Sequence, residues 1–174
     1  YDGILIPGGF GKRGIEGKVE AIQFARENRV PFLGLCLGFQ LATVEYARNK
    51  AGIADATSEE FGEGTHVIAI LPEQENVNEL GGTMRLGNYT ADIRDGTLAR
   101  KLYGEKQVGE RHRHRYEVTP EYIAILEKAG LVFSATNRNR RECLELRDHP
   151  DLFATQVHPE FKSRPTKPSP PYLG

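Results

Sequence analysis

The residue best suited to chemistry is Cys36, which ends a short apolar run and begins a helical pattern. Residues 30–40 read VPFLGLCLGFQ, so the cysteine lies between two glycines in a Gly-x-Cys-x-Gly arrangement. Flanking glycines permit a sharp strand-to-helix turn with the thiol at its apex. The N-terminus of the following helix favours a thiolate there. We therefore interpret Cys36 as a nucleophile, the alternative being a buried structural cysteine.

A cysteine nucleophile needs a base, and His158 is the best candidate among the five histidines. It follows residues 153–157, an apolar stretch that predicts a strand, and would lie on the same rim of a parallel sheet as the cysteine. Glu160, two residues later, is spaced to accept a hydrogen bond from the imidazole and select its tautomer. His-Pro-Glu alone is a weak signal, because a histidine at a strand end is usually just partly exposed. Its combination with the cysteine turn makes it a strong one.

Attack on an amide carbon also needs hydrogen-bond donors for the developing oxyanion. The backbone N–H of Leu37, next to the nucleophile, is one candidate, and the glycine turn at Gly8 and Gly9 is the expected source of the second. The alternatives for that turn are a plain tight turn or a phosphate-binding loop. No Gly-Lys-Ser/Thr follows it, which weakens the phosphate interpretation.

The order of the predicted elements indicates an α/β fold. The alternation of strand, glycine-rich turn, helix, strand and helix over residues 3–49 predicts a doubly wound, mostly parallel sheet flanked by helices. The 174 residues show no repeat or linker and are expected to form one domain. We expect strands at residues 3–7, 31–36, 66–71, 81–86, 89–93, 110–118, 131–135, 142–146 and 153–157, and helices at 18–28, 37–49, 97–103 and 120–129. We expect residues 81–93 to form a hairpin and the proline-rich tail to be extended surface.

The overall charge and the cysteine content argue against several classes of function and of binding site. The 23 Lys and Arg residues nearly balance the 24 Asp and Glu residues, so the overall charge indicates neither nucleic-acid nor membrane binding. Cys36 and Cys143 form neither a metal-ligand spacing nor a disulfide framework, and we expect Cys143 to be structural. His112 and His114 lack partners at metal-ligand spacing, so no metal site is expected. No signal or membrane-spanning segment is visible, and a reducing, cytoplasmic compartment is expected.

Seven motifs give the chain a resemblance to class I (triad-type) glutamine amidotransferases, which have a flavodoxin-like fold. Three are general to that class: PGGFG at residues 7–11, GLCLGFQ at 34–40 and HPE at 158–160. Four others narrow the resemblance to the glutaminase domain of the CTP synthases: SEEF at 58–61, GGTMRLG at 81–87, ERHRHRYE at 110–117 and SRPTKPSPP at 163–171. Residues 62–65 depart from the family pattern. The resemblance covers essentially the whole chain and implies a partial domain, lacking the first strands, the last helix and the synthase domain.

The resemblance implies a Cys36–His158–Glu160 triad that hydrolyses L-glutamine through a thioester. It implies oxyanion donors at Gly9 and Leu37. It further implies that glutamine contacts Gly9, Leu37, Gln40, Glu60 and Arg115. In that family the ammonia passes to a synthase domain of the same polypeptide, which uses ATP and Mg²⁺ to convert UTP to CTP. The family also implies activation by GTP and a homotetramer for the full-length enzyme.

Three other interpretations remain at this point. One is a class I amidotransferase that serves another acceptor, against which the motifs at residues 81–87 and 110–117 argue. Another is a cysteine hydrolase of similar fold, which predicts a histidine directly after the cysteine, where this chain has Leu37. The last is a noncatalytic assembly module, against which the presence of all three triad residue types argues.

Overall fold

The computed structural model describes residues 2–70 and 84–173, whose elements alternate between strands and helices. In chain order the elements are β1 (Ile4–Ile6), α1 (Ile15–Asn28), β2 (Phe32–Leu35), α2 (Leu37–Asn49), β3 (Ala56–Ser58), β4 (Thr65–Ala69), β5 (Arg85–Ile93), α4 (Leu98–Tyr103), β6 (Gln107–His114), β7 (Glu117–Val118), α5 (Pro120–Lys128), β8 (Leu131–Asn137), β9 (Arg140–Leu146) and β10 (Leu152–Thr155), followed by the 3₁₀ turns η1 (Pro159–Phe161) and η2 (Pro170–Tyr172).

The strands form one seven-stranded sheet and one small three-stranded sheet. The large sheet has the order β1-β2-β10-β9-β8-β5-β6, and the small sheet the order β3-β4-β7. In the large sheet, β1, β2 and β10 are parallel, whereas every neighbour from β10 to β6 is antiparallel. The predicted α/β class is confirmed, but the sheet is mixed. Its antiparallel half follows from short connections such as residues 138–139 between β8 and β9, because parallel neighbours need a long crossover.

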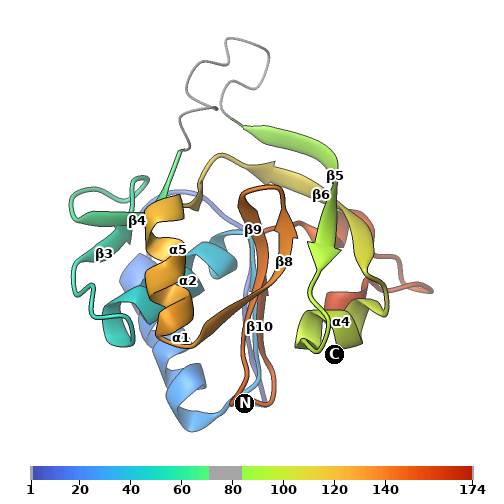
Figure 1. The fold of residues 1–174 in the computed structure, drawn as a ribbon, viewed down its shortest axis with the longest axis horizontal. Coiled ribbons are helices and arrows are strands. Elements are labelled where there is room, and N and C mark those ends of the chain that lie inside the picture. The colour runs from blue at the N-terminus through green and yellow to red at the C-terminus, as the bar shows by residue number, and fades with distance from the viewer. Residues whose placement is uncertain (1, 71–83, 174) are drawn as a thin grey trace.

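Helices cover the two faces of the large sheet unequally (Figure 1). Helices α1, α2 and α5 lie on one face, and the short helix α4 lies on the other. Successive side chains of β10 point to opposite faces of the sheet, so this strand contributes to the core on each face. Leu152 and Ala154 pack on the side of α1, α2 and α5, and Phe153 packs on the α4 side. The main core therefore lies between the sheet and the three larger helices.

Several predicted elements are confirmed within a residue or two. Helix α2 spans Leu37–Asn49 as expected, and α5 begins at Pro120 and ends one residue early. Thr97 caps α4, since its hydroxyl accepts a hydrogen bond from the Arg100 N–H at 3.2 Å. These elements carry strong local signals: an apolar periodicity, a proline in the first turn and a capping side chain.

Other predicted elements differ from the structure where contacts between distant parts of the chain outweigh the local sequence pattern. Residues 85–93 form one strand, β5, instead of two hairpin arms, because Arg85–Asp92 pair continuously with β6; residues 81–83 lie outside the described part. Helix α1 begins three residues early, where Gly14 adopts a left-handed conformation (φ 69°) and Ile15 is buried. Strand β3, within a segment expected to be a loop, pairs with β4. Strand β10 ends at Thr155, and the tail forms a 3₁₀ turn with Pro171 buried.

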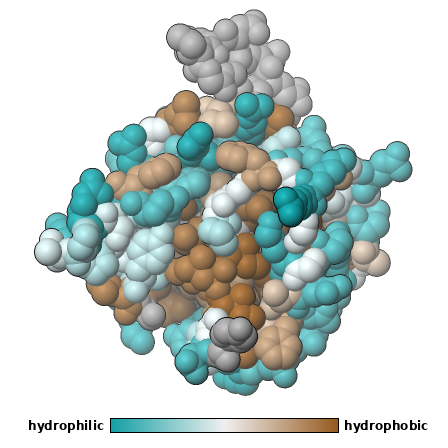
Figure 2. Space-filling model, turned by 180° about the vertical axis from the view of Figure 1, so that it is seen from behind, coloured by the Kyte–Doolittle hydropathy of each residue, from teal (hydrophilic) through white to brown (hydrophobic). Residues whose placement is uncertain are grey.

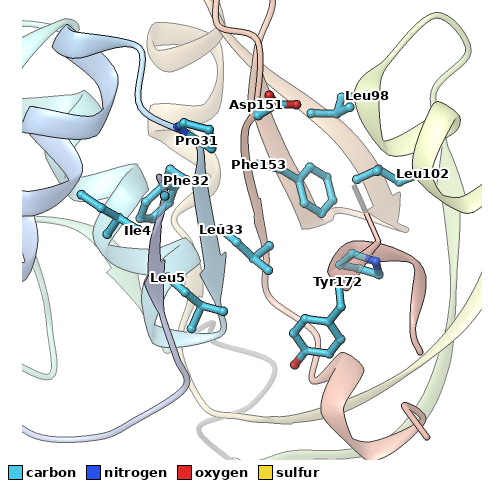
Figure 3. A pocket seen from close by; sticks show the side chains of 12 residues that line it. Ile4, Leu5, Pro31, Phe32, Leu33, Leu98, Leu102, Asp151, Phe153 and Tyr172 are labelled. Atoms are coloured by element: carbon cyan, nitrogen blue, oxygen red, sulfur yellow. The ribbon is translucent and has the colours of Figure 1, made fainter. Parts of the chain in front are cut away.

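The α4 face of the sheet carries an apolar hollow of about 310 Å³ beside β1 and β2. In Figure 2 it is the brown area near the centre of the molecule, and Figure 3 shows Leu33, Phe153, Leu102 and Tyr172 around it. Leu5, at its rim, is 51% exposed. Asp151 is its one acidic or basic lining residue, so the hollow lacks the groups that acid–base chemistry needs.

The elbow between β2 and α2 predicts a sharp contrast between two glycine substitutions. A Cβ at Gly38 would lie 2.4 Å from the Ile6 carbonyl oxygen, whereas one at Gly17 on the exposed side of α1 meets nothing within 4 Å. We expect Gly38→Ala to lower the free energy of unfolding by about 1–3 kcal/mol through overpacking. Gly17→Ala should raise it by about 0.5–1 kcal/mol through helix propensity.

Thermal unfolding of the protein that carries this chain measures both changes. An unchanged midpoint for Gly38→Ala would show that the close approach of α2 to β1 is not a constraint.

Candidate active site

Cys36 occupies a strained turn between β2 and α2. Its backbone has φ 48° and ψ −95°, a conformation that residues with a side chain rarely adopt. The Cys36 N–H donates to the Thr155 carbonyl at 2.8 Å and continues the parallel pairing of β2 with β10. Strain held in place by a sheet and a helix is typical of functional turns, where it aims a side chain. The predicted strand-to-helix elbow at Cys36 is confirmed.

His158 lies beside the cysteine, at the turn that follows β10. A methyl group placed on Gly8 would be 3.0 Å from His158 Cε1 and 3.6 Å from Cys36 Cβ, so both side chains border the same small space. The His158 Nδ1–H donates to Glu160 Oε1 at 2.5 Å, which leaves the lone pair of the neutral ring on Nε2. His158 Nε2 is buried and has no hydrogen-bond partner among the described residues. The structure thus brings Cys36, His158 and Glu160 together.

The protonation state of Cys36 differs from the thiolate that its helix position suggests. Burial raises the pKa of the Cys36 thiol to about 12, and the charges of Glu160, Glu60 and Glu117 add to this increase. The backbone N–H of Leu37 acts in the opposite direction and lowers the pKa, but its effect is smaller. At neutral pH the cysteine is therefore a thiol in this structure. Attack by its sulfur requires transfer of the proton, and His158 Nε2, which is buried without a hydrogen-bond partner among the described residues, is the candidate acceptor.

Backbone and side-chain groups that the sequence did not single out complete the surroundings of the pair. The Arg111 carbonyl accepts from the His158 N–H at 2.9 Å, and the Arg113 carbonyl lies 4.0 Å from Cys36 Sγ. Gln156 Nε2 lies 3.6 Å from the same sulfur. Phe161 stacks on the His158 ring with a centroid distance of 5.0 Å. The sequence contained one signal for Gln156. It is a polar residue inside an apolar run, two positions before the histidine.

Two of the five predicted glutamine-binding residues line a cleft of about 320 Å³. Glu60 and Arg115 line it together with Phe10, Met84 and Tyr116. Glu60 Oε1 accepts a hydrogen bond from the Gly11 N–H at 2.7 Å. The cleft therefore presents one carboxylate and one guanidinium, which complement an ammonium and a carboxylate.

The remaining predicted binding residues join this cleft to the cysteine. Gln40 is 3% exposed, and its Nε2 lies 3.4 Å from the Tyr116 carbonyl and 3.3 Å from Gln156 Oε1. A Cβ at Gly9 would lie 3.2 Å from a methyl group of Leu37, so the glycine turn packs directly against the elbow. The two candidate oxyanion donors, the N–H groups of Gly9 and Leu37, thus belong to segments in contact.

The described residues give little support to a reactive second cysteine, to a group that could bind a metal, or to a helix that could span a membrane. Cys143 is 3% exposed, with its Sγ 3.5 Å from Thr155 Oγ1, as suits the structural role expected of it. Residues 2–70 and 84–173 contain no group of three His, Cys, Asp or Glu residues arranged to hold a metal ion. None of the described helices has the length and apolar character needed to cross a bilayer.

Comparison with known proteins identifies the family to which this chain belongs. The family model described as glutamine amidotransferase class-I matches residues 1–173, and the chain therefore belongs to this family. Within it, the chain is 81% identical over its whole length to a CTP synthase from Methanoregula boonei and 67% identical over 99% of its length to one from Methanoculleus marisnigri. The chain spans 33% of the length of each of these two relatives.

A solved structure points to the same part of those enzymes. The glutaminase domain of Trypanosoma brucei CTPS, determined with bound acivicin, superimposes with a TM-score of 0.92 at 44% sequence identity. The match covers 99% of this chain and 68% of that one. The similarity is thus to the glutaminase part of the CTP synthases, as the sequence motifs predicted.

The raised pKa of Cys36 predicts its reactivity toward iodoacetamide in the absence of substrate. Because the thiolate is the reactive form, the rate should rise about tenfold per pH unit between pH 7 and 10, without a plateau. Peptide-resolved mass spectrometry would follow Cys36 directly, and Cys143→Ser should leave the profile unchanged. A plateau already reached near pH 8 would mean that Cys36 is ionised in the resting protein.

Proposed function

We propose that the chain is a glutaminase domain that hydrolyses the side-chain amide of L-glutamine with Cys36, His158 and Glu160. The observation that carries the proposal is the placement of Cys36 and His158 around Gly8, with Glu160 hydrogen-bonded to Nδ1 of the imidazole. A buried thiol needs an adjacent base, and a base needs a group that selects its tautomer. His158 and Glu160, which belong to one of the shared motifs, are proposed to fill these two roles.

In the first half-reaction, His158 Nε2 takes the proton of Cys36 as Sγ attacks the amide carbon of glutamine. The N–H groups of Gly9 and Leu37 stabilise the negative oxygen of the tetrahedral intermediate. The imidazolium, stabilised by Glu160, then gives its proton to the departing nitrogen, and ammonia leaves a γ-glutamyl thioester on Cys36. In the second half-reaction, His158 takes a proton from water, the hydroxide adds to the thioester, and glutamate leaves as Cys36 regains its proton.

Recognition of glutamine is assigned to groups around the cleft. Arg115 suits the α-carboxylate, because a guanidinium presents paired donors to two carboxylate oxygens. Glu60 suits the α-ammonium, which requires an acceptor of opposite charge. Gln40 lies between the cleft and the elbow, where a side-chain amide is suited to contact the extended substrate. These assignments follow the family motifs, and the presence of Glu60 and Arg115 in one cleft supports two of them.

The fate of the ammonia belongs to a longer protein. We propose that this chain is part of a CTP synthase polypeptide, in which a synthase domain uses ATP and Mg²⁺ to convert UTP to CTP with the ammonia released here. Activation by GTP and assembly into a homotetramer are proposals for that longer protein. The free state of Cys36 and Cys143 is consistent with a cytoplasmic location. The relatives are CTP synthases, which favours UTP over another acceptor.

Substitution of the nucleophile tests the proposal in the full-length protein. Cys36→Ala should abolish CTP formation with glutamine, because no thioester can form, and should leave CTP formation with added ammonia intact. Steady-state rates with the two nitrogen sources make the comparison. Cys143→Ser is the matched control and should retain both activities. Glutamine-dependent synthesis by Cys36→Ala would contradict the triad.

Covalent labelling provides a second test. The wild-type protein incubated with 6-diazo-5-oxo-norleucine should carry one adduct on the peptide that contains Cys36. A folded sample that remains unlabelled, or is labelled elsewhere, would count against the glutaminase assignment.

The charge of the cleft predicts a separate effect on substrate affinity. Arg115→Lys removes the paired donors for the α-carboxylate and should raise the KM for glutamine about 10–100-fold while kcat changes little. Arg94→Lys, an exposed position that does not line the cleft, is the control. Equal KM values for the two variants would show that Arg115 does not bind the substrate.

A further inference from the structure

Strand β6 contacts both the candidate base and the candidate nucleophile through its backbone. The carbonyls of Arg111 and Arg113 face the His158 N–H and Cys36 Sγ, respectively. These alternate residues share one edge of the strand, and β6 is the last strand of the sheet within residues 2–70 and 84–173, where it pairs with β5. The position of β6 therefore influences how the base and the thiol meet.

Two buried histidines alternate with those arginines on β6. His112 and His114 are 2% and 1% exposed, and His112 Nδ1 lies 2.8 Å from His114 Nε2. His114 Nδ1 lies 3.2 Å from the Tyr116 carbonyl. A carbonyl only accepts, so His114 Nδ1 carries the hydrogen and His114 Nε2 accepts from the Nδ1–H of His112. The two rings thus form a directed hydrogen-bond chain along the strand.

The histidine pair lies against a buried cluster of ionisable side chains from three other strands. Arg85 of β5 pairs with Glu142 of β9 at 2.8 Å and with Glu117 of β7 at 3.5 Å, and Arg140 Nε lies 3.1 Å from Glu117. His112 Nε2 lies 3.7 Å from Glu142 Oε2, and His114 Nδ1 lies 3.7 Å from Glu117 Oε1.

The surroundings keep both rings uncharged. Burial lowers the pKa of His112 to about 2 and that of His114 to about 3, and the nearby positive charge of Arg85 acts in the same direction for both. The His112 ring also meets the edge of Tyr89 at a centroid distance of 5.3 Å, and Arg85 covers that tyrosine at 4.3 Å. The rings therefore act as neutral, fixed hydrogen-bonding groups.

We infer that His112 and His114 are positioning residues that fix β6 so that its Arg111 and Arg113 carbonyls hold His158 and Cys36 in register. This inference rests on the proposed glutaminase reaction. Neither imidazole touches the reacting atoms; each acts through the strand that carries it. Because a displacement of about 1 Å in such a site can lower a rate about 100-fold, the pair affects turnover more than substrate binding.

A pair of substitutions at His112 tests this role in the full-length protein. His112→Leu removes the hydrogen donated to His114 and should lower kcat for glutamine hydrolysis about 10–100-fold. The KM for glutamine and the ammonia-dependent rate should remain within about threefold of the wild type. His112→Asn keeps an N–H donor near the position of Nδ1 and should restore most of kcat. Gln107→Ala, an exposed residue at the far end of β6, is the control.

The inference would be overturned by wild-type kcat in His112→Leu, or by equal losses in the Leu and Asn variants. A loss that appears in KM instead of kcat would also overturn it, because it would assign His112 to substrate binding. Failure of the wild-type protein to hydrolyse glutamine, or to react at Cys36, would instead refute the proposed function before any variant is compared.

A measurement on the wild-type protein covers the case in which His112→Leu does not fold. Nuclear magnetic resonance of ¹⁵N-histidine, with signals assigned from the His112→Asn variant, should show both rings neutral and protonated on Nδ1 from pH 6 to 8. A proton on His114 Nε2, or titration of either ring in that range, would contradict the directed chain and with it the inference.

Discussion

The arrangement of the site depends on the parallel pairing of β2 with β10. That pairing continues beyond both strands as the 2.8 Å hydrogen bond from the Cys36 N–H to the Thr155 carbonyl. Parallel strands end at the same rim of a sheet, so a cysteine after one strand and a histidine after the other become neighbours. The close approach of Gly38 to the Ile6 carbonyl then fixes the direction in which helix α2 leaves the turn. The candidate triad is thus a consequence of strand order.

Burial determines the protonation states of the ionisable groups at and around this site. The same desolvation that raises the pKa of Cys36 lowers the pKa of His112 and His114, so all three groups are neutral in the resting protein. Glu160, in contrast, has a side chain that is 43% exposed, where water lowers the cost of a charge. In the proposed reaction, the neutral thiol would ionise only as its proton passes to the imidazole that Glu160 orients.

The apolar core and the buried ionisable cluster draw on different elements. The helix-covered side of the large sheet supplies most of the apolar core, whereas side chains from β5, β6, β7 and β9 form the buried ionisable cluster. Such a cluster adds little net stability, because each charge loses its hydration, but its directional bonds favour one arrangement of the strands. The apolar hollow on the α4 face is distinct from the triad and shares no lining residue with it.

Local signals in the sequence determined the elements and residue types. The periodicity of residues 37–49, the proline that begins α5, the Thr97 cap and the glycines around Cys36 each act within a few residues, and the helices and the turn predicted at these places are confirmed. The tertiary structure alone decided the mixed sheet, the single strand β5 and the pairing that forms β3, because these depend on partners far away in the chain. It also decided the protonation of Cys36 and the contacts that Gln156 and the β6 carbonyls make with Cys36 and His158. Desolvation and backbone contacts arise from packing, and neither is encoded in the type or spacing of a residue.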